Sequence, residues 1–113
     1  MNIETQKSGD TLVVCLKEKR LDSSISQDFE STMKKWIADN ETRILLDFEN
    51  VNFVDSTGMG SIVSCLKNLK TNDSEGYLVL AGINEHVMSL FKLTRMDRVF
   101  PIYHNKAQAL QNL

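Results

Sequence analysis

The chain has one proline, two cysteines and no long hydrophobic run among its 113 residues. The apolar run nearest the amino terminus, Leu12 to Leu16, spans five residues and follows the charged Glu4, Lys7 and Asp10. A secretory signal contains an apolar stretch of about seven residues or more, and a transmembrane helix needs about 20. We therefore expect a cytoplasmic protein with neither a signal peptide nor a membrane span.

The cysteines and glycines do not form the motifs of a metal or cofactor site. Cys15 and Cys65 stand apart, without a CxxC spacing or a neighbouring histidine, whereas zinc sites and thiol motifs need such companions. No glycine is followed by lysine, which excludes the phosphate-binding loop GxxxxGK[ST]. We expect two buried, reduced thiols, no metal and no cofactor.

The charges are of both signs and are spread along the chain, with a formal net charge of -2. Proteins that bind nucleic acid usually carry a basic surface, so we expect no nucleic-acid partner. One basic cluster lies near the end of a predicted helix, where cations interact favourably with the helix dipole; an acidic partner is the alternative. The cluster comprises Lys92, Arg95 and Arg98.

The hydrophobic pattern predicts a single α/β domain over residues 1–113, a length close to that of many single domains. Strand and helix periodicities alternate in the order β-β-α-β-α-β-α-β-α, which predicts a mixed sheet covered by crossover helices. Strands are predicted at residues 3–7, 12–17, 44–48, 77–81 and 99–103, and helices at 25–37, at 57–70, after Asn84 and after Asn105.

The first predicted helix carries an apolar stripe and a start signal. Ser24, with Gln27 three residues later, matches a capping box. Trp36 is in register with the stripe, so we expect it in the core, although an exposed binding anchor is the alternative. The other members of the stripe are Ile25, Phe29, Met33 and Ile37.

The most informative segment joins the predicted strand at 44–48 to the helix at 57–70 through Asp55-Ser56-Thr57-Gly58. A hydroxyl in the first turn of a helix lies among unpaired backbone N–H groups, at the positive end of the dipole. A phosphate on Ser56 would therefore meet favourable groups. Gly58 and Gly60 are unusual in a helix; either a partner or phosphate approaches the backbone there, or the helix packs tightly on the sheet.

Two enzyme interpretations are weaker. The spacing Gly58-Met59-Gly60 has Val63 where a dinucleotide-binding loop has its third small residue. A hydrolase would use Ser56 with His86 or His104 as base, but the GxSxG motif is absent. We expect surface histidines and no enzyme activity.

The segment Asp55-Ser56-Thr57-Gly58-Met59-Gly60, after a strand that contains Asp47, resembles the signature of the STAS-domain anti-sigma factor antagonists. Three further segments follow in the order that the family shows: 20–24, 80–82 and 90–100. The resemblance implies a STAS fold over nearly the whole chain. It also implies that Ser56 is the phosphorylated serine.

The resemblance further implies a function. The unphosphorylated protein would bind a cognate anti-sigma factor, itself an ATP-dependent serine kinase, and so release a sigma factor; a metal-dependent serine phosphatase would restore the active form. Asp22 and Asp55 can also be explained as a helix-leading carboxylate and a turn former. The implied partner surface comprises Asp22, Ser23, Ser24, Asp55, Ser56, Thr57, Gly58, Met59 and Gly60.

STAS domains also occur as scaffold subunits of signalling assemblies, as regulatory domains of anion transporters and as accessory subunits of lipid-transport ATPases. A transporter domain would normally follow membrane spans, which the sequence lacks. The scaffold and accessory roles remain alternatives, although the Asp-Ser-Thr-Gly-Met-Gly segment is closer to the phosphorylated group.

Overall fold

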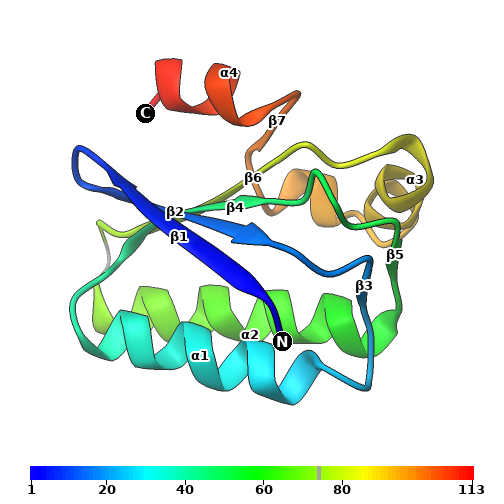
Figure 1. The fold of residues 1–113 in the computed structure, drawn as a ribbon, viewed down its shortest axis with the longest axis horizontal. Coiled ribbons are helices and arrows are strands. Elements are labelled where there is room, and N and C mark those ends of the chain that lie inside the picture. Colours follow the sequence, from blue (N-terminus) through cyan, green and yellow to red (C-terminus); the bar gives the residue numbers. More distant parts are fainter. Residues whose placement is uncertain (74) are drawn as a thin grey trace.

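A five-stranded mixed sheet forms the centre of the fold (Figure 1). The computed structural model describes residues 1–73 and 75–113. The strands of the sheet lie in the order β1-β2-β4-β6-β7. Their bounds are Ile3–Ser8 for β1, Thr11–Leu16 for β2, Arg43–Asp47 for β4, Tyr77–Ala81 for β6 and Ile102–Tyr103 for β7.

β1 and β2 form an antiparallel hairpin, and β2, β4, β6 and β7 run parallel to one another. Val13 pairs with Leu45, which pairs with Val79, and all three side chains are buried. Parallel strands are normally covered on both faces and therefore have continuous apolar centres. The predicted α/β class with a mixed sheet is confirmed. β7, which follows Pro101, is an edge strand, as expected of a segment that starts with a residue unable to donate a ladder hydrogen bond.

The helices lie on both faces of the sheet and at one end of it (Figure 1). α1 (Ser26–Ala38) and α2 (Ser56–Asn72) cover one face, and the short α4 (Lys106–Gln111) covers the other. α3 (Glu85–Leu93), followed by the 3₁₀ turn η1 (Met96–Arg98), lies at the end where the parallel strands finish. The larger core lies between the sheet and α1 and α2, and the smaller one packs Ala109 of α4 against the other face.

Several local predictions are confirmed and others are wrong. Asn84 and Asn105 cap α3 and α4 with their side chains, as expected. Cys65 is buried, but Cys15 is only partly buried, because it lies on the less covered face of the sheet. Trp36 packs against the core and remains partly exposed. The turn predicted at 72–76 includes Ser74, which lies outside the described residues, and α2 continues through Asn72.

The predicted capping box is wrong. α1 begins at Ser26, and its capping residue, Ile25, makes no side-chain cap. The Asp22 carbonyl accepts instead from the Ser26 backbone N–H at 2.9 Å. The Ser24 hydroxyl donates to the nearby Asp22 carboxylate and therefore does not interact with the start of the helix.

Candidate functional site

Two very short parallel strands build the site, and the sequence did not predict them. β3 (Arg20–Leu21) pairs with β5 (Phe53–Val54), with Arg20 opposite Phe53 and Leu21 opposite Val54. Leu21 and Val54 point into the core, where they are 0% and 6% exposed. This ribbon places the chain just after Leu21 beside the start of α2 (Figure 1). The two segments of the expected partner surface therefore meet.

Asp55 holds the two segments together. It is the N-cap of α2, and its Oδ1 accepts from the backbone N–H of Gly58 at 2.7 Å. Its Oδ2 accepts from the backbone N–H of Ser23 at 3.1 Å, across 32 residues of sequence. One carboxylate thus satisfies an otherwise unpaired N–H of the helix and fixes the loop after β3.

Ser56 and Thr57 are the first two residues of α2, and both are exposed. The N–H groups of these first positions have no acceptor within a helix, and the dipole places partial positive charge there. The helix starts one residue earlier than the sequence pattern predicted. Ser56 therefore presents its hydroxyl to solvent at the position where a phosphate would find donors and a favourable field.

The two glycines of α2 have different roles. A Cβ on Gly58 would lie 2.1 Å from the carbonyl oxygen of Leu21, whereas a Cβ on Gly60 would meet nothing within 4 Å. Gly58 is buried and Gly60 is exposed. Tight packing therefore explains Gly58. The backbone at Gly60 is open, so close approach by a partner remains the explanation for that glycine.

The expected surface residues differ in accessibility. Met59 is 6% exposed and belongs to the core, so its side chain supports the site from beneath. Asp22 and Asp55 are partly exposed. The exposed members are Ser23, Ser24, Ser56, Thr57 and Gly60.

Asp22 organises the loop after β3. Its Oδ1 accepts from the Ser24 backbone N–H at 3.0 Å and from the Ser24 hydroxyl, and its Oδ2 accepts from Arg20 Nε at 3.0 Å. These hydrogen bonds favour the ionised carboxylate, so they hold the pKa of Asp22 below its ordinary value, the Ser24 hydroxyl contributing most.

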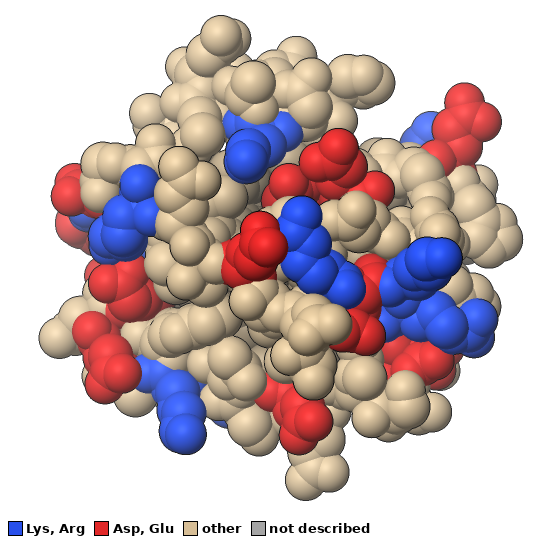
Figure 2. Space-filling model, in the orientation of Figure 1, with Lys and Arg blue, Asp and Glu red and all other residues tan. Residues whose placement is uncertain are grey.

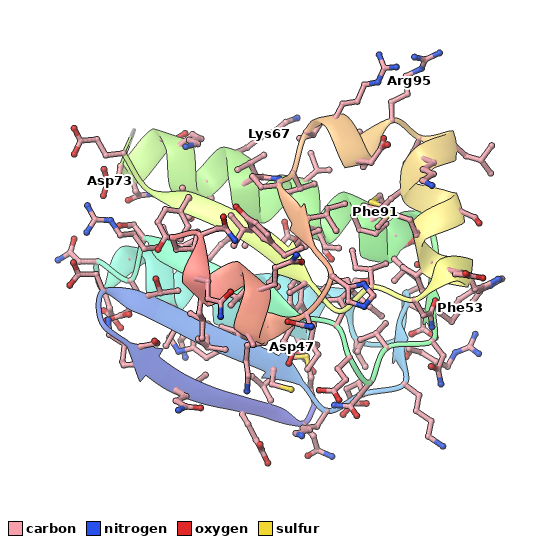
Figure 3. The ribbon with its side chains drawn as sticks, turned by 90° about the horizontal axis from the view of Figure 1, so that it is seen from above. Asp47, Phe53, Lys67, Asp73, Phe91 and Arg95 are labelled. Carbon is pink, nitrogen blue, oxygen red and sulfur yellow. The ribbon has the colours of Figure 1, made fainter. Side chains whose placement is uncertain are left out.

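Arg20 and Phe53 are site residues that the sequence analysis did not single out. The Arg20 guanidinium lies 4.2 Å from the centroid of the Phe53 ring, a cation–π geometry. Figure 3 shows Phe53 at the end of the molecule opposite Asp73, which caps the far end of α2. Arg20 and Phe53 meet because they lie opposite each other in the β3–β5 register, which the local periodicity of the sequence does not reveal.

The competing enzyme interpretations gain no geometric support. His86 on α3 and His104 before α4 are both exposed, and residues 1–73 and 75–113 show no hydrogen bond from Ser56 to either imidazole. The described residues contain no group of three His, Cys, Asp or Glu side chains arranged to hold a metal ion. None of the helices in the described part of the chain has the length and apolar character needed to span a membrane.

Comparison with known families agrees with this geometry. The STAS domain family matches residues 2–109. The chain belongs to the STAS domain family. The match includes the β3–β5 ribbon, the capped start of α2 and the whole central sheet.

Relatives of this STAS domain carry the name anti-sigma factor antagonist. A Thermotoga maritima protein provisionally assigned as an anti-sigma factor antagonist is 30% identical over 95% of this chain and 94% of its own length. The anti-sigma-B factor antagonist of Staphylococcus aureus is 32% identical over 83% of this chain and 84% of its own. The phosphorylated form of the Bacillus cell fate determinant SpoIIAA shares the fold, with a TM-score of 0.74, 18% identity and 98% coverage of both chains.

Proposed function

We propose that this STAS domain is an anti-sigma factor antagonist controlled by phosphorylation of Ser56. In its unphosphorylated form it binds an anti-sigma factor that is also its serine kinase, and it thereby releases a sigma factor. A metal-dependent phosphatase reverses the modification, and the domain itself catalyses no reaction. The observation that carries the proposal is the exposed hydroxyl of Ser56 at the start of α2, directly beside the loop that Asp55 fixes.

The names of the relatives support the general role, and the phosphorylated form of SpoIIAA is a case in which a protein of this fold carries a phosphate. The proposed contact surface includes the loop residues Asp22 to Ser24, the exposed start of α2 at Ser56 and Thr57, and the open backbone of Gly60. Asp55, Gly58 and Met59 complete it by shaping and supporting the backbone.

Charge and bulk provide a physical mechanism for the switch. A phosphate adds about -1.5 to -2 charges at neutral pH. Within the domain, the helix N-terminus attracts that charge and the neighbouring Asp55 repels it, so the two effects oppose each other. At an interface shaped for a hydroxyl, the phosphate must lose water or hold the partner away, which costs several kcal/mol of binding free energy, where about 1.4 kcal/mol is tenfold.

The test uses three single variants, with Thr57→Ala as the matched control because Thr57 is the neighbouring exposed hydroxyl. Wild-type protein is used to capture proteins from cells of the source organism, and the captured kinase is then purified. We expect phosphosite mapping to find the phosphate on Ser56 in wild type and in Thr57→Ala, and none in Ser56→Ala. Ser56→Asp should bind the kinase weakly while keeping a near-native circular dichroism spectrum and melting temperature.

Phosphate found only at Thr57, or only on Ser23 and Ser24, would contradict the assignment of Ser56. A Ser56→Asp protein that melts far below wild type would show that its weak binding reflects misfolding. Capture of a transport ATPase or of a large signalling assembly in place of a kinase would favour the accessory or scaffold role of STAS domains.

A further inference from the structure

A hollow beside β3 lies at the edge of the proposed partner surface and shares Asp22 and Ser24 with it. It has a volume of about 380 Å³ and lies between the amino-terminal segment, residues 17–20 and the loop after β3. We call it the Arg20 hollow. Its charged and apolar lining residues are Lys17, Glu18, Lys19, Arg20, Asp22 and Ile25.

The lining has more cations than carboxylates, although the whole chain has a net charge of -2. The Glu18 carboxylate already has a hydrogen-bond partner, because its Oε2 accepts from the Asn2 backbone N–H at 2.7 Å. Lys17 makes only a 3.7 Å ion pair with Glu4, and Lys19 makes none among the residues that the structure describes. Figure 2 shows Lys and Arg side chains next to Asp and Glu side chains over the region where Figure 1 places β3.

The Arg20 side chain is held by two contacts and still has N–H donors available for a partner. Its Nε donates to Asp22, and its guanidinium lies against the Phe53 ring at 4.2 Å. A guanidinium has five N–H donors, and the described part of the chain shows no acceptor for those on the two Nη atoms. The side chain is nevertheless 61% exposed. Because Phe53 and Asp22 already order this side chain, it loses less conformational entropy when a partner binds it.

The Arg20 hollow is continuous with the surface around Ser56. Side chains alternate along a strand, so Arg20 and Asp22 lie on the outer face of the ribbon while Leu21 is buried. Asp22 begins the loop whose Ser23 N–H is bonded to Asp55. A protein that covers Ser56 and this loop therefore reaches the Arg20 hollow next.

We propose that the Arg20 hollow receives a carboxylate side chain of the anti-sigma factor, bound by the Nη donors of Arg20, with Lys19 adding positive charge and Ile25 an apolar wall. The inference rests on the proposed function, because it names the partner's chemistry at the edge of that surface. A planar guanidinium matches a carboxylate with two parallel hydrogen bonds. Arg20 is thus the residue that selects a partner carrying an acidic side chain at this point.

The experiment measures binding of the purified anti-sigma factor, captured as described above, by surface plasmon resonance at low and high salt. The variants are Arg20→Gln, Arg20→Lys and the charge-reversal variant Arg20→Glu. Arg43→Gln is the matched control, because Arg43 is also an arginine in an ion pair, with Asp10 at 3.4 Å, and its side chain is 41% exposed. It begins β4 at the opposite end of the sheet. Melting temperatures of all variants are compared with wild type.

We expect Arg20→Gln to weaken binding about tenfold. Dissociation should be faster because the paired hydrogen bonds are lost, and association should be slower and less dependent on salt because the charge is lost. The affinity of Arg20→Lys should lie between those of wild type and Arg20→Gln, and Arg43→Gln should bind as wild type does. An anti-sigma factor in which the contacting Asp or Glu is changed to Lys should recover affinity for Arg20→Glu, and this recovery would identify the carboxylate.

Arg20→Gln binding as tightly as Arg43→Gln, while Ser56→Asp still binds weakly, would overturn this inference and leave the proposed function intact. If Arg20→Gln bound more weakly than wild type but with unchanged salt dependence, the inference would also be overturned, because Arg20 would then act only by holding the Asp22 loop. If wild-type protein bound no anti-sigma factor at all, the proposed function itself would fail first.

Discussion

Replacing Gly58 by alanine should destabilise the protein, although the same change at Gly60 should stabilise it. Both glycines lie in the first turns of α2, and alanine is the better helix former by about 1 kcal/mol. The surroundings differ. A Cβ at position 58 would be 2.1 Å from the backbone oxygen of Leu21, and a Cβ at position 60 would meet nothing within 4 Å.

The size of the effect follows from these contacts. The oxygen of Leu21 belongs to the backbone of β3, which is paired with β5, so it cannot turn away as a flexible side chain would. Overpacking of this kind costs about 1–3 kcal/mol, of which helix propensity returns part. We expect Gly58→Ala to lose about 2 kcal/mol of unfolding free energy and Gly60→Ala to gain about 0.5–1 kcal/mol.

Urea denaturation followed by circular dichroism measures both unfolding free energies. At about 4 °C per kcal/mol for a domain of this size, the two variants should differ in melting temperature by roughly 10 °C. Equal stability of the two variants, or a stabilised Gly58→Ala, would refute the claim that the close approach of β3 requires glycine at position 58.

Three further outcomes follow from the structure. Asp55→Ala removes the cap of α2 and the acceptor for the Ser23 N–H, and should lower the unfolding free energy by about 1–2 kcal/mol; urea curves that match wild type would contradict this. The pKa of Asp22 is lowered from its ordinary 3.8, so its contribution to stability is present at neutral pH and is lost as the pH falls through that lowered pKa. In acid, the unfolding free energy of Asp22→Asn should therefore decrease less steeply with falling pH than that of wild type. Burial raises the pKa of the Cys65 thiol to about 12, so a maleimide at pH 8 should label the partly buried Cys15 first and reach Cys65 only after unfolding; equal labelling rates in native protein would count against the buried placement.

The long elements were predictable because each buries a repeating stripe that is visible in local sequence. The strand at β4 and the helix α2 each carry enough apolar residues in register to define their period. β3 and β5 were not predictable in this way, because two residues are too few to show a period. Their pairing depends on an encounter between segments far apart in the chain.

The details of the site were harder to predict for a related reason. Sequence alone gave Gly58 and Gly60 the same two explanations, and the position of the Leu21 carbonyl separates them. Ser24 met the pattern of a helix cap, but Asp22 was the nearer acceptor for its hydroxyl. Asp55 was expected to form a turn or contact a partner, and its bond to Ser23 depends on the unpredicted ribbon.

The arrangement at the start of α2 separates what the fold needs from what the proposed switch needs. Gly58 and Met59 are buried and fix the helix against β3 and the core. Ser56 precedes them and is exposed, so a phosphate there displaces no buried contact. Since the helix terminus also supplies free N–H donors to an anion, the domain can tolerate a large change of charge at Ser56. In the proposed switch, phosphorylation of Ser56 would therefore change the charge of this surface while its shape stays the same.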